Sequence, residues 1–180
     1  MKASTYATWT MMPVDSTTVI STPSAFNITR EFVRTIMPDV TTIFEKDYFY
    51  ARVQTKTINV TFSPDYSDAL HDAFVQEHFN VSINSFLMGI LHELGHIATF
   101  DEDLNHDRAI LYYMLKLDFE RARYKDFTNM YFAIPSEFEA TKWGVEYYLS
   151  HKEQCDNFLK EVEPAIAWFK KVWGYEDEAE

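Results

Sequence analysis

The spacing of apolar and polar residues predicts a mainly helical chain with one short β-hairpin. Apolar residues recur at helical spacing over residues 24–37, where Ser24 is a natural N-cap and Pro38 follows the end. From Tyr48 the period changes to two, which is typical of strands with one buried face, so we expect a hairpin over residues 48–62. Its inward-facing side chains are expected to be Phe49, Ala51 and Val53 on one strand and Ile58, Val60 and Phe62 on the other.

The most apolar segment lies in the middle of the chain. Residues 85–100 are apolar almost all round, which predicts a helix buried on every side. A helix over residues 67–79 is expected before it, with Leu70, Ala73 and Phe74 on one stripe.

The remainder of the chain is expected to be helical as well. A polar loop is predicted over residues 101–106, and further helices are predicted to start at Asp107, near Ser136 and near Pro164. We therefore expect a helix-rich α+β fold in which a small antiparallel sheet packs against the buried central helix.

Composition narrows the class of protein. A length of 180 residues fits one domain, here with an irregular arm over residues 1–23 and an acidic tail over residues 176–180. Only four glycines and 17% aromatic residues favour a helical fold with bulky packing. The net charge of −12 argues against nucleic-acid binding, and the single cysteine, Cys155, cannot form an internal disulfide. With neither a signal peptide nor a membrane-spanning run, we expect a cytoplasmic protein.

The buried helix contains the motif that carries chemistry, His92-Glu93-Leu94-Gly95-His96. Residues four apart lie one above the other on a helix, so the two imidazoles can hold one metal ion. Glu93, one residue round the helix, can act as general base toward a water activated by zinc. Such polar groups are costly on an apolar helix unless something satisfies them, which favours a metal site over two hydrogen-bonded core histidines.

A catalytic zinc normally takes three protein ligands, so a third is needed beside the two histidines. The candidates for it are Glu137, Glu139 and His106. The positions at which a metzincin would carry Gly and His hold Thr99 and Glu102, which excludes that arrangement.

A capping box favours Glu137 among these candidates. Ser136 can cap the helix that it begins, and Glu139 can fold back on that cap, which leaves Glu137 free to point at the metal. Thr141 lies four residues beyond Glu137 on the same face and can hydrogen-bond a ligand.

The two motifs together resemble those of the ImmA/IrrE-type zinc metallopeptidases of bacteria and phages. In that family a histidine–glutamate helix is followed by Glu-x-x-Ala-Asn-x-Phe-Ala, and here Glu137-Phe138-Glu139-Ala140-Thr141-Lys142-Trp143-Gly144 follows. The resemblance covers about the middle third of the chain. It implies a gluzincin-like zincin domain with one zinc ion on His92, His96 and Glu137, and with Glu93 as base. The departures are Thr141 for Asn, Trp143 for Phe and Gly144 for Ala.

The expected function is hydrolysis of a peptide bond in a protein or peptide substrate. The candidates for stabilising the developing oxyanion are Tyr131, Tyr147, His106 and His151. An exposed edge of the hairpin can pair with an extended substrate. The alternative is a catalytically inactive zincin-like binding or assembly protein with a structural metal site, although such a protein has no use for Glu93 beside the metal.

Overall fold

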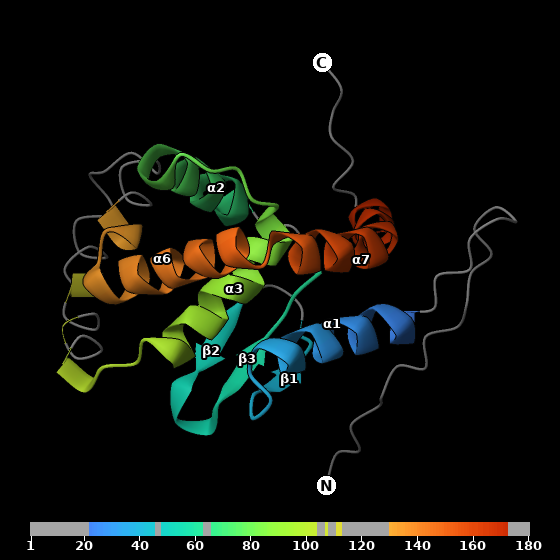
Figure 1. The fold of residues 1–180 in the computed structure, drawn as a ribbon, viewed down its shortest axis with the longest axis horizontal. Coiled ribbons are helices and arrows are strands. Elements are labelled where there is room, and N and C mark those ends of the chain that lie inside the picture. Colours follow the sequence, from blue (N-terminus) through green and yellow to red (C-terminus); the bar gives the residue numbers. More distant parts are fainter. Residues whose placement is uncertain are drawn as a thin grey trace, which may run out of the picture.

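The structure is a computed structural model, and it describes residues 22–45, 48–62, 66–103, 107, 111–112 and 130–172. Besides a 3₁₀ helix, η1 (Val53–Thr55), five α-helices and three short strands have defined bounds within these residues (Figure 1). In chain order they are α1 (Thr22–Ile36), β1 (Thr41–Ile43), β2 (Tyr50–Arg52), β3 (Thr57–Asn59), α2 (Tyr66–Phe79), α3 (Ser85–Ala98), α6 (Pro135–Ser150) and α7 (Lys152–Val172). The fold is helix-rich with one small sheet, which confirms the predicted α+β class.

Helix α3 is the centre of the fold, as its apolar sequence predicts. It contacts the sheet on one side and α2 and α6 on the other (Figure 1). Every residue from Phe86 to Gly95 is buried. Its first turn is capped by Asn84, whose side-chain oxygen accepts hydrogen bonds from the backbone N–H groups of Phe86 and Leu87 at 3.0 and 3.3 Å. The central helix is therefore fixed at its start by a cap and along its length by burial.

The sheet is mixed, whereas the sequence analysis predicts an antiparallel one. The predicted hairpin is present, since β2 and β3 pair antiparallel with Ala51 opposite Ile58. The third strand, β1, pairs parallel with β3 and gives the order β1-β3-β2. Three residues are too few to show a period of two, and a parallel partner is distant in sequence, so β1 carries no local pattern.

Helix α1 begins at Thr22, two residues before the predicted cap at Ser24. Pro23 fits this start, because a proline in the first helical turn has no N–H group that needs a partner. Residues 1–21 lie outside the described residues, as does the predicted acidic tail.

Helix α7 corrects the prediction of a helix start near Pro164. The helix begins at Lys152 and continues through Pro164. Proline removes one backbone hydrogen bond inside a helix, but the apolar stripe of α7 on either side of Pro164 is buried in the core. Its buried members recur every three or four residues: Cys155, Phe158, Val162, Ala165 and Phe169. Burial of this stripe outweighs the local penalty, so the proline does not end the helix.

Helix α2 is present as predicted, but a different face is buried. Ala73 is exposed and the side chain of Leu70 lies outside the described residues, whereas His71, Phe74 and Val75 are buried. Positions i, i+3 and i+4 form the stripe that faces α3 and α6. The predicted polar loop over residues 101–106 is also partly wrong. Glu102 and Asp103 are helical, and the Asp101 side chain accepts a hydrogen bond from the Asp103 N–H at 2.9 Å.

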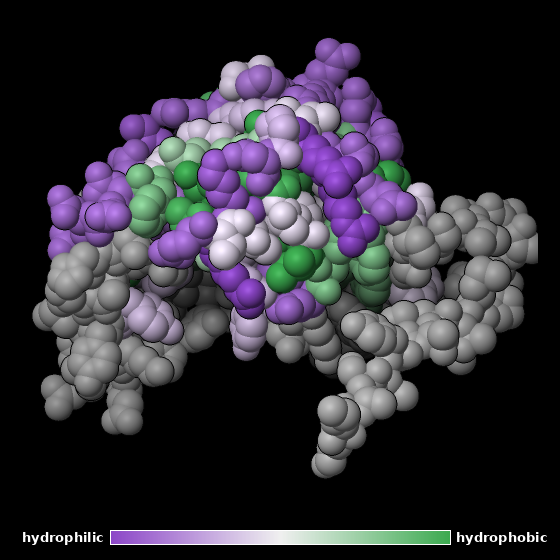
Figure 2. All heavy atoms as spheres, turned by 90° about the horizontal axis from the view of Figure 1, so that it is seen from below, coloured by the Kyte–Doolittle hydropathy of each residue, from purple (hydrophilic) through white to green (hydrophobic). Residues whose placement is uncertain are grey.

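Hydrophilic residues cover most of the described part of the face shown in Figure 2, where apolar residues form several small groups. No described helix combines the length and the apolar character that crossing a membrane requires.

Asp72 makes the stability depend on pH. One of its carboxylate oxygens is buried with no hydrogen-bond partner among the described residues, and burial raises the pKa of Asp72 from about 3.8 to about 6. Between these two values the folded state binds more protons than the unfolded state, so this group's contribution to the free energy of unfolding falls as the pH rises. We expect Asp72→Asn to raise the melting temperature at pH 7.5, and this gain to shrink toward pH 4.

Thermal unfolding of Asp72→Asn and wild type across this pH range measures the effect. Asp39→Asn is the control, because Asp39 is exposed and its pKa is lowered by its hydrogen bond with Lys56. That variant should show no gain at pH 7.5. A gain for Asp72→Asn that grows as the pH falls would contradict the assignment.

Candidate metal centre

Helix α3 brings both predicted histidines and the predicted base to one end of the core. His92 and Glu93 are 6% and 7% exposed, and the side chain of His96 is 13% exposed. The motif lies in the second half of a helix that is otherwise apolar and completely buried. The two histidines are therefore on one helix, as their spacing predicts, and both lie largely inside the fold.

Helix α6 supplies the third group, and a glycine lets it approach. A Cβ atom at Gly95 would lie 2.3 Å from the carbonyl oxygen of Ala140 and 2.8 Å from its Cα, so only glycine fits between the two backbones. This close crossing places the first turn of α6, and with it Glu137, directly against the two histidines. The Glu137 side chain is completely buried.

Three ligand atoms converge at this crossing. The Nε2 atom of His92 lies 3.1 Å from the Oε2 atom of Glu137 and 3.1 Å from the Nε2 atom of His96. The third side of the triangle, from His96 Nε2 to Glu137 Oε2, measures 3.2 Å. The structure thus contains a nearly equilateral group of two imidazole nitrogens and one carboxylate oxygen that can hold a metal ion.

The dimensions of the triangle fit zinc. The three atoms lie close enough together for one ion to contact all of them at the usual Zn–N and Zn–O distances of about 2.0–2.1 Å. Two imidazoles and a carboxylate are also a known ligand set of catalytic zinc, one that leaves a position open.

The electrostatics of Glu137 point the same way. Burial acts to raise the pKa of this carboxyl, but the adjacent imidazoles of His92 and His96 outweigh burial, and the pKa lies well below its usual value. The group therefore stays ionised inside the core. A buried carboxylate surrounded by imidazole nitrogens is a favourable place for a cation.

Thr141 supports His92 from behind, as its spacing from Glu137 predicts. Its hydroxyl oxygen lies 3.0 Å from the Nδ1 atom of His92. The same oxygen lies 3.3 Å from the Nε2 atom of His71 on α2. Sequence reasoning did not find His71, although it stands three and four residues before Phe74 and Val75, which share its buried face. Burial, and then the nearby His92, keep the pKa of His71 well below its usual value.

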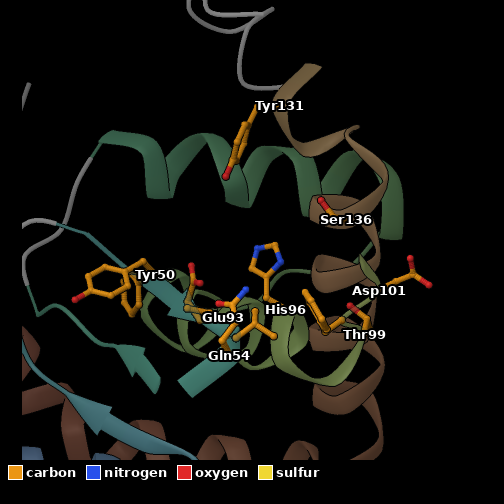
Figure 3. A pocket seen from close by; sticks show the side chains of 12 residues that line it. Tyr50, Gln54, Glu93, His96, Thr99, Asp101, Tyr131 and Ser136 are labelled. Carbon is orange, nitrogen blue, oxygen red and sulfur yellow. The ribbon is translucent and has the colours of Figure 1, made fainter. Parts of the chain in front are cut away.

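A pocket of about 260 Å³ opens beside His92, His96 and Glu137, the candidate metal-binding triad, and is lined by both Glu93 and His96. Figure 3 shows these two side chains rising from α3 on the same side, with the hydroxyl end of Tyr131 directed toward them from the opposite wall. The edge strand β2 and the turn after it form another wall, through residues 49–51, Val53 and Gln54. The pocket thus joins the candidate base, one candidate ligand and an exposed strand.

Three other predicted candidates lie elsewhere. Glu139, the second candidate ligand, has a 44% exposed side chain and pairs with Lys142 at 3.8 Å. Tyr147 and His151 stack on each other with ring centroids 4.1 Å apart. They stand about 15 and 21 Å beyond Glu137 along the axis of α6.

His106 lies outside the described residues. Tyr131 is thus the one oxyanion candidate that lines the pocket among those that the structure describes.

The capping box used to choose Glu137 is absent. Helix α6 begins at Pro135 with Ile134 at the N-cap, and no side chain caps it. The Ser136 hydroxyl has no hydrogen-bond partner among the described residues, so Glu139 does not fold back onto it. Glu137 meets the histidines for another reason: it occupies the face of α6 that crosses α3 at Gly95.

No family model, curated protein or solved structure matches the chain.

Proposed function

We propose that the protein is a zinc-dependent metallopeptidase with a zincin-like fold. The observation that carries the proposal is the convergence of His92, His96 and Glu137 within a triangle of 3.1–3.2 Å sides, next to a pocket that also contains Glu93. The combination of the buried histidine–glutamate helix with a short sheet beside it supports the resemblance to ImmA/IrrE-type peptidases. That resemblance otherwise depends on the two sequence motifs.

Zinc is the proposed cofactor, held by the two Nε2 atoms and by Glu137 Oε2. When bound, it would lower the pKa of a coordinated water to about 7 and polarise the carbonyl group of the scissile peptide bond. The ionised carboxylate that such an ion requires matches the low pKa of Glu137.

Glu93 is the proposed general base and acid. It accepts a proton from the attacking water and later donates this proton to the leaving amine. Its position on the pocket wall, next to His96 rather than within the ligand triangle, suits a group that moves protons.

Tyr131 is the proposed donor to the oxyanion. Its hydroxyl is directed toward Glu93 and His96 across the pocket (Figure 3). We expect Tyr131→Phe to lower kcat by about 10²–10³-fold, which is the usual cost of losing one such donor, with KM and zinc content little changed. Steady-state kinetics on one peptide substrate measures this, with Tyr147→Phe as the control. Equal losses in both variants would contradict the role of Tyr131.

The proposed substrate is an extended segment of a protein or peptide. Strand β2 pairs only with β3 among the described residues, so its other edge offers backbone groups to an added strand beside the pocket. A peptide paired with this edge would pass the candidate base.

The decisive experiment compares two acidic residues of α6. Zinc content and zinc affinity are measured for wild type, Glu137→Gln and Glu139→Gln, together with hydrolysis of unstructured protein substrates. We expect about one zinc per chain for wild type and for Glu139→Gln. For Glu137→Gln we expect zinc affinity to fall by more than about 100-fold, because losing a ligand should weaken binding more than the 10–100-fold that follows from losing a residue that only hydrogen-bonds a ligand. Hydrolysis should follow zinc content.

Loss of zinc in Glu139→Gln but not in Glu137→Gln would overturn the ligand assignment. Zinc bound as expected without hydrolysis of any substrate would favour the alternative of an inactive binding or assembly protein.

A further inference from the structure

His71 belongs to a layer of side chains behind the metal-binding triad. It comes from α2, a third helix beside those that carry the ligands, and it is 8% exposed. Its ring stacks on Phe132 at a centroid distance of 4.2 Å with 7° between the planes. Its edge-to-face contact with the ring of His92 has a centroid distance of 4.9 Å. Packing therefore holds the imidazole in one orientation.

The hydroxyl of Thr141 lies between His71 and His92, 3.3 Å from Nε2 of the first and 3.0 Å from Nδ1 of the second. A hydroxyl group can donate one hydrogen bond and accept others. If the Thr141 proton goes to His71, the hydroxyl can only accept from His92. Without an acceptor at His71, the same proton can go to His92 Nδ1 instead.

The direction of these hydrogen bonds decides whether His92 can bind a metal. A neutral imidazole carries its proton on one nitrogen, and the other nitrogen holds the lone pair that a metal needs. When Thr141 accepts from Nδ1–H, the lone pair is on Nε2, the atom that faces Glu137 and His96. When Thr141 donates to Nδ1, the proton moves to Nε2 and blocks the site.

We propose that His71 is a positioning residue of the metal centre. By accepting the hydroxyl proton of Thr141 at its Nε2 atom, it holds His92 in the tautomer whose Nε2 points unprotonated at the ion. This inference deepens the proposed function and rests on its metal centre. It assigns a metal-supporting role to a helix that carries none of the ligands.

The test combines zinc affinity with two pairs of variants. His71→Phe keeps the stack on Phe132 but loses the acceptor, whereas His71→Gln keeps an acceptor near the original Nε2 position. Thr141→Val and Thr141→Ser form the matching pair for the hydroxyl. We expect His71→Phe and Thr141→Val each to weaken zinc binding about 10–100-fold, measured by competition with a chelating indicator. His71→Gln and Thr141→Ser should retain most of the wild-type affinity.

The double variant separates a relay from ordinary packing. If His71 acts through Thr141, His71→Phe combined with Thr141→Val should weaken zinc binding no more than either change alone. Independent packing losses would instead multiply. Wild-type zinc affinity in a folded His71→Phe protein, or multiplied losses in the double variant, would overturn the proposal.

A second readout does not need zinc or activity. Long-range ¹H–¹⁵N NMR spectra of metal-free protein labelled with ¹⁵N-histidine report the tautomer of His92. We expect a larger share of the Nδ1–H form in wild type and in His71→Gln than in His71→Phe, in which the Nε2–H form that faces the Glu137 carboxylate should increase. An unchanged tautomer would refute the relay even if the protein is a peptidase. The expected shift in a protein that hydrolyses nothing would support the relay and refute the peptidase.

Discussion

Glu93→Gln is expected to abolish peptide hydrolysis while zinc stays bound. A general acid–base residue contributes about 10²–10⁴-fold, so kcat/KM should fall by that factor, or by about 3–5 kcal/mol in transition-state stabilisation. Glutamine has nearly the same shape as glutamate, and Glu93 contributes none of the three atoms of the ligand triangle. Zinc content should therefore equal that of wild type, and the melting temperature should change little.

The measurement pairs metal analysis with steady-state kinetics on one defined peptide. Glu139→Gln is the matched control, since it removes the same charge from a partly exposed site outside the pocket. Glu139→Gln should have the zinc content and the kcat/KM of wild type. A Glu93→Gln protein as active as wild type would remove Glu93 from the mechanism, and a zinc-free one would make Glu93 part of the metal site.

Part of the candidate metal centre could be predicted from the sequence because some relations between its side chains are local. His92 and His96 are separated by one helical turn, and so are Glu137 and Thr141, so a helix alone decides which side chains share a face. The convergence of the two helices is not local. It depends on Gly95 fitting against the backbone of Ala140, and one sequence does not reveal which residue a glycine meets.

His71 and β1 were missed for a related reason. The stripe containing His71 is visible only once its register against α3 and α6 is known, because Ala73 and Leu70 fit helical spacing equally well. Strand β1 has three residues and a parallel partner far along the chain. For α7 the error was the reverse: the local rule that a proline ends or begins a helix was applied at Pro164. In the structure the helix continues through Pro164, because a long apolar stripe on either side of it is buried.

Gly95→Ala is expected to damage the fold and the metal centre together. In an exposed helix this change would stabilise the protein by up to about 1 kcal/mol through helix propensity. Here the new Cβ atom would lie 2.3 Å from the Ala140 carbonyl oxygen, and a helix backbone atom cannot turn aside as a side chain can. Overpacking of this kind costs about 1–3 kcal/mol or more, so the net free energy of unfolding should fall.

Zinc affinity should fall with it, because any separation of α3 from α6 draws Glu137 away from His92 and His96. Gly144→Ala is the comparison at the same crossing, since its nearest contact, at 2.8 Å, is the flexible end of the Met88 side chain. Denaturant unfolding and zinc competition should rank wild type first, Gly144→Ala next and Gly95→Ala last. If Gly95→Ala were as stable as wild type and bound zinc equally well, the close crossing of the two helices could not be what assembles the site.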